Sequence, residues 1–335
     1  MLVQAQKESL KVNDLTILEV SANTLEKVGQ DVIEGLTKTP KSLPAKYFYD
    51  QRGSEIFEAI CQLPEYYPTR TEALILCQYA EEIAQITGTC ELIELGSGSS
   101  TKTRLLLDAY QAQKKFCKYV PIDVSETILK ESAIQLQKDY PALYIQELVG
   151  TYEQALAQFT PTIWPARMIF FLGSSLGNFN PSQCDYLLNQ ITGVLEPGDY
   201  FLLGIDLQKP QDILEAAYND SQGVTAAFNL NMLSHLNWRF GANFDTHFFT
   251  HEAIYNQEKS QIEMYLTCQS SQIVHLENLD LTVTFKTGES MLTEISRKFD
   301  LELMEKDLEL KGLKTIKIFT DPQNWFGLIL CRKSS

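Results

Sequence analysis

The sequence predicts a doubly wound α/β domain with a mostly parallel sheet and a second, smaller α+β domain. Between residues 90 and 207, short apolar runs alternate with helical patterns about every 25 to 35 residues, which is typical of parallel strands joined by right-handed crossover helices. One apolar run, Leu92 to Leu95, leads through a glycine-serine turn directly into a helical pattern. After residue 207 the alternation changes to a long helical stretch and then closely spaced strands, which indicates an insertion or a cap.

Composition limits the class of protein. The 335 residues are 44% hydrophobic and 21% charged, as in a soluble globular protein, and a net charge of −15 argues against nucleic acid or an anionic membrane as the main partner. No apolar run approaches the roughly 20 residues of a membrane span and the N-terminus lacks a signal-peptide core, so we expect a cytoplasmic protein. Because the seven cysteines form no CxxC and the pair His247 and His251 lacks the HExxH carboxylate, we expect neither a disulfide framework nor a metal site.

Three helices are predicted before the first strand. Residues 14–40 carry a helical pattern that ends in the breaker-rich stretch TKTPKSLPAK. A second helix is expected over residues 54–61. A third is expected over residues 71–86, where Thr69 or Thr71 can cap the first turn.

Tyrosines are concentrated in this part of the chain. Four of them lie between Pro44 and Pro68, namely Tyr47, Tyr49, Tyr66 and Tyr67. Aromatic faces with hydroxyl tips suit a small polar ligand, so the segment can form a lid or a pocket wall. The alternative is a surface hairpin whose rings only pack against one another.

The turn after the first strand can hold a nucleoside. Gly96 and Gly98 let backbone N–H groups approach a ligand closely, and the helix expected over residues 101–110 has an apolar face. Since the GxG spacing lacks the third glycine of the dinucleotide fingerprint, a nucleoside fits better than NAD. An ordinary turn between strand and helix is the alternative.

Four more strands are predicted, over residues 119–122, 144–149, 169–172 and 200–205, with a helix over residues 125–136. Ligands of doubly wound folds lie beyond the carboxyl ends of the strands, and the residues at these ends are Gly96, Asp123, Gly150, Gly173 and Asp206. Asp123 follows Gly96 at about the spacing of the acid that meets a ribose hydroxyl in nucleotide-binding βαβ units.

The region after residue 207 is predicted to be helical at first and then to form strands over residues 253–256, 261–268 and 281–285, before a last strand over 327–331. We therefore expect a cofactor-binding domain made of residues 70–207 and 300–335. A substrate-binding domain would comprise residues 14–69 and 208–299.

Five segments resemble one known family. They are SLPAKYFYDQRGSEIFEAICQLPEYYPTRTE, ELGSGSSTKTRLLLDA, FFLGSSLGNFNP, YNDSQGVTAAFNLN and GESMLTEISRKF. In these segments and their order, the chain closely resembles the S-adenosylmethionine-dependent histidine Nα-methyltransferases of ergothioneine biosynthesis, from about Lys41 to the last strand. The resemblance implies a Rossmann-like class I methyltransferase fold, S-adenosylmethionine as cofactor, L-histidine as substrate and no obligate protein partner.

The resemblance also implies which residues bind the cofactor. The family's cofactor loop, ribose acid and closing tyrosine match, in turn, Gly96, Gly98 and Lys102, then Asp123, then Tyr66. A neutral loop suits an adenosyl sulfonium, which has no phosphate. The family often has Gly-Asp where this chain has Gly150-Thr151, and that aspartate would face the adenine amino group. Thr151, or backbone groups beside Tyr152, would take its place.

The substrate residues implied by the resemblance are Tyr49, Asn178, Tyr218, Met264, Glu294 and Ser296. Asn178 can offer its amide to the α-carboxylate or the α-amine, and Tyr218 can donate its hydroxyl to the carboxylate. Glu294 and Ser296 lie two apart in TEIS, so in an extended segment both face one side and can bind the two imidazole nitrogens. Without the resemblance, Glu294 would be interpreted as a solvated surface residue and Asn178 as a turn residue.

The implied reaction is in-line transfer of the sulfonium methyl to the α-amino nitrogen, repeated until the trimethyl betaine forms. A free α-amino group has a pKa near 8, so little base strength is required and placement should dominate. We expect Tyr49 to orient the amine through its hydroxyl or its ring face, without a strong general base.

Three other functions fit parts of the pattern. Methylation of another amino acid, such as tryptophan, is disfavoured by Glu294, because an indole has only one N–H to donate. A non-catalytic S-adenosylmethionine sensor is disfavoured because both the cofactor loop and the substrate groups are present. A dinucleotide-dependent oxidoreductase would need the missing third glycine.

Overall fold

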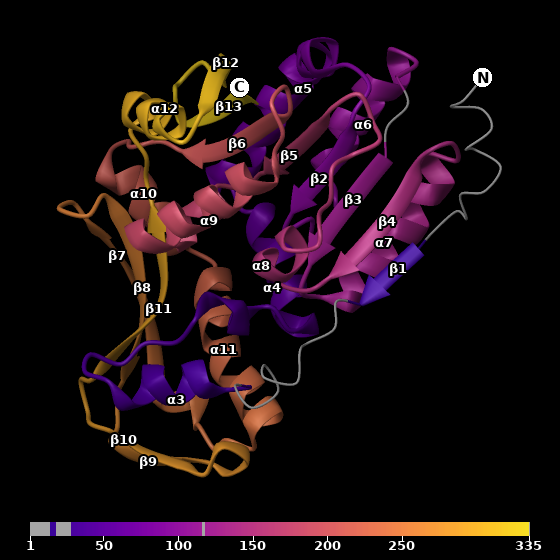
Figure 1. The fold of residues 1–335 in the computed structure, drawn as a ribbon. Helices are drawn as coiled ribbons and strands as arrows, with labels where there is room; N and C mark the ends of the chain where they lie inside the picture. The colour runs from indigo at the N-terminus through magenta and orange to yellow at the C-terminus, as the bar shows by residue number, and fades with distance from the viewer. Residues whose placement is uncertain (1–13, 18–27, 116–117, 335) are drawn as a thin grey trace.

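The computed structural model describes residues 14–17, 28–115 and 118–334, and a large sheet flanked by helices dominates it (Figure 1). The strands of this sheet are β1 (Asp14–Ile17), β2 (Glu91–Leu95), β3 (Lys118–Asp123), β4 (Tyr144–Val149), β5 (Arg167–Phe171), β6 (Tyr200–Asp206), β12 (Leu313–Thr320) and β13 (Phe326–Lys333). They lie in the order β1-β4-β3-β2-β5-β6-β13-β12. The strands from β1 to β6 pair in parallel, whereas β13 and β12 run antiparallel. The predicted mostly parallel sheet is confirmed.

Helices cover both faces of this sheet, which confirms the doubly wound arrangement. One face is covered by α5 (Tyr67–Thr87), α6 (Thr103–Ala112) and α7 (Glu126–Asp139). The other face is covered by α8 (Tyr152–Leu156), α9 (Pro181–Val194) and α12 (Leu301–Leu310). Every residue of β2, β5 and β6 is buried, as expected for parallel strands covered on both sides. Because the strand order reverses between β2 and β5, the ligand crevice of this fold lies at their carboxyl ends.

A smaller lobe adjoins that edge of the sheet (Figure 1). Its helices are α3 (Gln30–Thr37), α4 (Gln51–Cys61), α10 (Gln211–Tyr218) and α11 (Val224–Phe240), with the short 3-10 helices η1 (Ala45–Phe48), η3 (Thr246–Phe248) and η4 (Glu277–Leu279). Its strands are β7 (Phe249–Asn256), β8 (Gln261–Cys268) and β11 (Ser290–Arg297) in one antiparallel sheet, and β9 (Gln272–Leu276) with β10 (Leu281–Phe285) in another.

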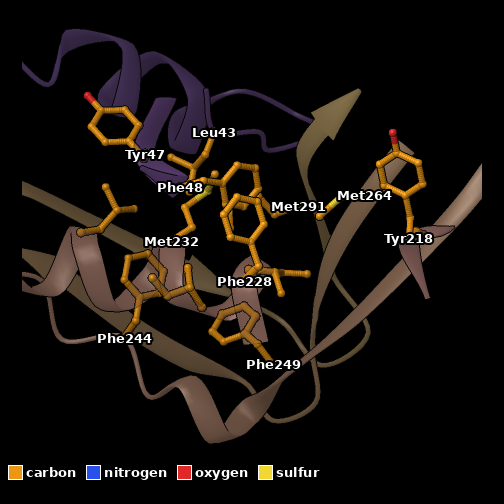
Figure 2. Packing of buried hydrophobic residues seen from close by; sticks show 14 of the residues in the cluster. Leu43, Tyr47, Phe48, Tyr218, Phe228, Met232, Phe244, Phe249, Met264 and Met291 are labelled. Atoms are coloured by element: carbon orange, nitrogen blue, oxygen red, sulfur yellow. The ribbon is translucent and has the colours of Figure 1, made fainter. Parts of the chain in front are cut away.

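One aromatic core unites the two distant parts of the chain that build this lobe. Figure 2 shows Phe48 from the N-terminal part packed on Phe228 from α11, and their rings stack with centroids 4.6 Å apart. Phe249 of β7 and Met264 of β8 belong to the same core. The N-terminal segment and the insertion after residue 207 therefore fold together.

The helix predicted over residues 14–40 is wrong in its first part. Asp14–Ile17 is a strand that pairs in parallel with β4 at the edge of the large sheet, and the helix itself spans only Gln30–Thr37. Residues 18–27 lie outside the described part of the chain. An open sheet edge offers backbone hydrogen bonds to any extended segment, and this long-range pairing leaves no local signal in the sequence. The strand also joins the large sheet, whereas the sequence placed residue 14 in the smaller domain.

The cap predicted for the helix before β2 is also wrong. Helix α5 begins at Tyr67, and no side chain caps it. Pro68 occupies its first turn, where the missing N–H costs no hydrogen bond. Thr71 lies inside the helix, and its hydroxyl donates to the Tyr67 carbonyl at 2.9 Å.

Two further findings concern the described ranges alone. None of their helices combines the length and the apolar character that a membrane span requires. No three side chains of His, Cys, Asp or Glu within these ranges form a group that could hold a metal ion.

Candidate active site

A pocket opens between the carboxyl edge of the large sheet and strands β8 and β11 of the smaller lobe. It holds about 600 Å³ of empty space, a volume that includes the solvent at its open mouth. Its lining includes all the residues that the resemblance assigned to the substrate, Tyr49, Asn178, Tyr218, Met264, Glu294 and Ser296, together with Tyr66. The other lining residues are Phe57, Ile60, Pro68, Gly173, Ser174, Ser175, Asp206, Thr225 and Phe228. We call this site the acceptor pocket.

Aromatic rings form one wall of the acceptor pocket. The ring of Tyr49 meets those of Phe57 and Phe228 edge-on, with centroids 5.8 and 5.7 Å away. Tyr66, just before α5, contacts the ring of Tyr218 at 6.1 Å. Burial raises the pKa of both Tyr49 and Tyr66 well above the ordinary phenol value. Both hydroxyls therefore stay protonated and can donate a hydrogen bond to a ligand.

The tyrosine-rich segment is a pocket wall, as predicted, and not a surface hairpin, because its residues form η1 and α4. Only two of its four tyrosines line the pocket. Tyr47 instead donates to Asp31 at 2.8 Å, and Tyr67 donates to Asp206 at 2.7 Å. The other two hydroxyls, of Tyr49 and Tyr66, make no hydrogen bond to any described residue.

Glu294 and Ser296 project into the pocket from one face of β11. This strand pairs antiparallel with β8, which places Glu294 opposite Met264. Both side chains line the pocket, as the two-residue spacing predicted. Burial raises the pKa of Glu294 to about 7, and the positive charge of Lys298 limits the rise. Glu294 can therefore gain or lose a proton near neutral pH.

Asn178 reaches the pocket on a turn that packs tightly against β11. It is the last residue of η2 (Ser175–Asn178), which follows β5. A Cβ atom on Gly177 would lie 2.9 Å from the carbonyl oxygen of Arg297, so a glycine is needed where η2 approaches β11. The backbone N–H of Asp206 donates to the hydroxyl of Ser174 at 2.9 Å. These contacts hold the turn that carries Asn178 between the two lobes.

A buried ion cluster lies behind Tyr218 and Ser296, and no sequence pattern indicated it. Asp206, at the carboxyl end of β6, pairs with Lys298 at 2.8 Å and with Lys209 at 2.5 Å. The three charged side chains are at most 2% exposed. Lys298 also donates to the hydroxyls of Tyr218, at 3.0 Å, and Ser296, at 2.9 Å. We call Asp206, Lys209 and Lys298 the ion cluster.

The second part of the site is the cofactor edge, which we define as residues 96–102, Asp123 and residues 150–152. Gly96 has a φ of +72°, and a Cβ atom on it would lie 2.8 Å from the hydroxyl oxygen of Tyr152. The N–H of Gly98 donates to the Asp123 carboxylate at 3.0 Å. Burial raises the pKa of Asp123, and hydrogen bonds from backbone N–H groups oppose the rise. Asp123, the acid predicted to bind a ribose, therefore also fixes the conformation of the loop.

Lys102 of the cofactor edge is held by a glutamate that the sequence did not single out. It pairs with Glu72 of α5, which is fully buried. The two oxygens of Glu72 also accept the N–H of Gly173, at 2.8 and 2.9 Å. A Cβ atom on Gly204 would lie 2.3 Å from Glu72 Oε1, so a glycine makes room for this carboxylate. Glu72 therefore joins α5, the cofactor loop and the turn after β5.

Thr151, predicted to lie near adenine, caps α8. Its hydroxyl oxygen accepts the N–H of Gln154 at 3.3 Å, and the Gln154 side chain accepts the N–H of Thr151 at 2.9 Å. This reciprocal pair is a capping box. Since the side chain is exposed and its hydroxyl hydrogen is not used in the cap, a contact with adenine stays a prediction.

The cofactor edge fits S-adenosylmethionine. The buried hydroxyl of Ser97 has no hydrogen-bond partner among the described residues, so a ligand can provide one. A Cβ atom on Gly98 would meet nothing within 4 Å, so the loop leaves space in front of its backbone. The loop's lysine is already neutralised by Glu72, which suits a ligand without phosphate. Below the loop, Glu94 accepts the hydroxyl of Thr103 at 2.6 Å and fixes the start of α6.

Similarity to known proteins spans nearly the whole chain. A family model described as histidine-specific, S-adenosylmethionine-dependent methyltransferase matches residues 28–333. The chain is 43% identical to the histidine N-alpha-methyltransferases of Mycolicibacterium smegmatis and of Mycobacterium tuberculosis, each match covering 91% of this chain and 94% of the relative. It is 32% identical to ergothioneine biosynthesis protein 1 of Neurospora crassa, over 88% of this chain and 33% of that protein. The matched range includes both the acceptor pocket and the cofactor edge.

Proposed function

The chain belongs to the family of histidine-specific, S-adenosylmethionine-dependent methyltransferases, and from this membership we propose that it methylates the α-amino group of L-histidine. We further propose that three methyl groups are added, so that the product is the trimethyl betaine hercynine. The reaction would form a step of ergothioneine biosynthesis. L-Histidine would be the small-molecule partner, and the protein would act in the cytoplasm.

The observation that supports this proposal most is the content of the acceptor pocket. Side chains from eight separate elements meet there, and the polar groups of Tyr49, Asn178 and Glu294 make no hydrogen bond to any described residue. Buried polar groups normally have partners, so groups without one, facing a pocket, suit a polar ligand. An amino acid with a polar side chain supplies such a ligand.

Glu294 and Ser296 complement an imidazole ring. A neutral imidazole has one N–H donor and one nitrogen acceptor. An ionised Glu294 can accept from the donor, and the Ser296 hydroxyl can donate to the other nitrogen. An indole has a single N–H and no acceptor, so it would leave the serine without a partner in the pocket. The pair therefore favours histidine over tryptophan as the methyl acceptor.

The remaining polar groups can bind the α-carbon end of histidine. Asn178 and Tyr218 carry hydrogen-bond donors that suit the α-carboxylate. Tyr49 would orient the α-amine, either through its hydroxyl or through its ring face. With an ordinary pKa near 8, about a tenth of the α-amine is neutral at pH 7, and alignment can supply much of the rate enhancement. We propose no strong general base in this site.

At the cofactor edge, Gly96, Gly98 and Asp123 would hold the nucleoside part of the methyl donor, with Lys102 on its flank. When bound, S-adenosylmethionine supplies an electrophilic methyl group. Tyr66 lies in the wall of the acceptor pocket, as do Pro68 and Gly173, and it can exclude water from the space between donor and acceptor. Excluding water favours transfer to the amine over loss of the methyl group to solvent.

The experiment that tests this proposal is mass spectrometry of histidine incubated with the protein and S-adenosylmethionine. We expect successive additions of one, two and three methyl groups, with the fully methylated species dominating at long times. A product that stops at one or two methyl groups would retain the enzyme class and overturn the trimethylation.

The same assay separates the alternatives when it includes a panel of amino acids. A clear preference for tryptophan would overturn the assignment of Glu294 and Ser296 to an imidazole. Calorimetry that detects binding of S-adenosylmethionine, but neither binding nor turnover of histidine, would favour a sensor.

A further inference from the structure

The hydrogen bonds of Lys298 determine which hydroxyl hydrogens of the acceptor pocket are available to a ligand. The ammonium group has three hydrogens, and the structure gives it three acceptors. These are the Asp206 carboxylate at 2.8 Å, the Ser296 hydroxyl at 2.9 Å and the Tyr218 hydroxyl at 3.0 Å. Lys298 is fully buried, and its three hydrogens match these three acceptors. Each of the two hydroxyls therefore has one lone pair occupied by the ammonium.

The two hydroxyls also bond to each other. The oxygens of Tyr218 and Ser296 are 2.8 Å apart, and either can be the donor. One of their two hydrogens makes this bond. Because the ammonium donates to both oxygens, neither hydroxyl can donate back to it. The second hydrogen is left for the acceptor pocket, which both residues line.

We propose that Lys298 is a positioning residue that keeps the one free hydroxyl hydrogen of the Tyr218–Ser296 pair turned toward the substrate as a hydrogen-bond donor. The inference rests on the proposed function, because it takes histidine as the ligand. In that ligand, the α-carboxylate and the unprotonated imidazole nitrogen both accept hydrogen bonds, and the free hydroxyl hydrogen can serve either of them. A pair of hydroxyls that could accept as readily as donate would recognise neither group well.

The ion cluster keeps Lys298 in the state that this role requires. Burial lowers the pKa of Lys298, but Asp206 and Tyr218 raise it by more, so the amine is charged at every physiological pH. Without the ammonium, the Asp206 oxygen that it now occupies could accept a hydroxyl hydrogen. A hydroxyl hydrogen of Tyr218 or Ser296 that donates to Asp206 is no longer available to a ligand in the acceptor pocket.

Lys209 provides a matched control within the ion cluster. It also pairs with Asp206 and is also buried, at 2% exposed. However, its other hydrogen bonds go to the hydroxyl of Tyr67 and the carbonyl of Leu207, and it makes none to Tyr218 or Ser296. Replacing either lysine by methionine removes one charge and leaves Asp206 the other lysine.

The test compares Lys298→Met and Lys209→Met by calorimetric titration with histidine and, separately, with S-adenosylmethionine. We expect both variants to lose thermal stability and to bind S-adenosylmethionine as the wild type does. Lys298→Met should raise the Kd for histidine about tenfold to a hundredfold, the range for loss of hydrogen bonds to charged groups. Lys209→Met should leave the Kd for histidine within about threefold.

A double-mutant cycle with Ser296→Ala distinguishes positioning from general support of the fold. If Lys298 acts through the hydroxyls, its replacement should weaken histidine binding less in the Ser296→Ala background than in the wild type. Fully additive losses, or equal losses from the two lysine variants, would overturn the inference. A wild-type protein that binds no histidine would instead refute the proposed function.

If Lys298→Met cannot be purified, Lys298→Gln takes its place in the same titrations. Its shorter neutral amide has two hydrogens and cannot serve all three acceptors. The Kd for histidine should still rise several-fold. An unchanged Kd for this variant would also overturn the inference.

Discussion

The cofactor edge and the acceptor pocket are neighbours, but they use their polar side chains in opposite ways. At the cofactor edge the charged groups bind the protein itself: Lys102 pairs with Glu72, and Asp123 accepts the N–H of Gly98. In the acceptor pocket the side chains of Tyr49, Asn178 and Glu294 make no hydrogen bond to any described residue. Apart from Ser97, the edge therefore uses its polar side chains to set the shape of a backbone loop. The pocket keeps its hydrogen-bonding capacity for a ligand.

Glu294 offers the strongest test of this contrast. We expect Glu294→Gln to lower kcat/KM for histidine about a hundredfold, because the amide cannot match a carboxylate as acceptor for an imidazole N–H. Binding of S-adenosylmethionine should not change, since Glu294 is not part of the cofactor edge. Steady-state kinetics with histidine, together with titration of the methyl donor, measure both quantities.

Glu252→Gln is the matched control for that experiment. Glu252 lies on β7 of the same lobe and is exposed, so its replacement should leave the kinetics unchanged. A variant Glu294→Gln that methylated histidine like the wild type would show that the imidazole is bound elsewhere.

Gly96 tests the other half of the contrast, since the edge should act through its backbone. A methyl group on Gly96 would both strain a residue at φ +72° and press against the Tyr152 hydroxyl at 2.8 Å. We expect Gly96→Ala to raise KM for S-adenosylmethionine about tenfold, with a smaller change in KM for histidine. Initial rates at varied concentrations of each substrate provide the measurement.

Gly88 provides the control for backbone strain. It has a similar φ of +69° at the end of α5, but a Cβ atom there would meet nothing within 4 Å. Because its ψ of −156° places it in a region that essentially only glycine occupies, Gly88→Ala should lose about 1 to 3 kcal/mol of stability without affecting KM for the methyl donor. If both variants raised that KM equally, general destabilisation would explain the loss.

Much of the large sheet could be predicted from the sequence because its signals are local. The strand predicted over residues 144–149 coincides with β4, and the one over 261–268 coincides with β8. Apolar runs bounded by turns define such strands without reference to their partners. Strand β1 could not be found in this way, because its existence depends on pairing with β4, more than 100 residues away. Nor did β9, half of a two-stranded sheet in the insertion, show a pattern of its own.

The residues of the site also differ in whether local sequence signals could predict them. Gly96, Asp123 and Asp206 could be placed at one edge from the positions of strand ends alone. The acceptor residues were named only through the resemblance, and the structure brings them together in one pocket. Glu72 and Lys298 were missed altogether. Isolated charged residues are usually on the surface, so only the tertiary structure shows that these two are buried and paired.

Tyr49 tests whether the pocket aligns the amine or deprotonates it. We expect Tyr49→Phe to lower kcat about three- to tenfold, because the phenol contributes one hydrogen bond and the ring wall is retained. With its pKa raised by burial, the Tyr49 hydroxyl is a poor base. The pH profile of kcat should therefore keep its shape in the variant.

Tyr47→Phe serves as the control for Tyr49. Its hydroxyl bonds to Asp31 outside the pocket, so methylation should continue at the wild-type rate. Full activity of Tyr49→Phe through all three methyl transfers would exclude any part for its hydroxyl.

The last prediction concerns stability, and it follows from keeping a carboxyl group without a partner in a buried pocket. The folded pKa of Glu294, about 7, lies above its unfolded value of 4.5. Between these values the folded state binds more protons than the unfolded state, so stability falls as pH rises from about 4.5 to 7 and stays lower above that. Glu294→Gln removes this cost. Glu294→Gln should raise the free energy of unfolding above that of the wild type, and this increase should be up to about 3 kcal/mol larger at pH 8 than at pH 5. That difference corresponds to several degrees in Tm.

Calorimetric melting of both proteins at pH 5 and pH 8, without ligands, measures this difference. Glu252→Gln, with its exposed carboxyl, should show no such dependence on pH. An equal effect of Glu294→Gln at the two pH values would mean that the ionised carboxylate is solvated in the empty pocket, and the contrast with the self-paired cofactor edge would then be weaker. If Glu294→Gln is more stable than the wild type only at high pH, the ionised Glu294 destabilises the empty acceptor pocket. This is the result expected for a carboxyl group that is retained to bind a ligand.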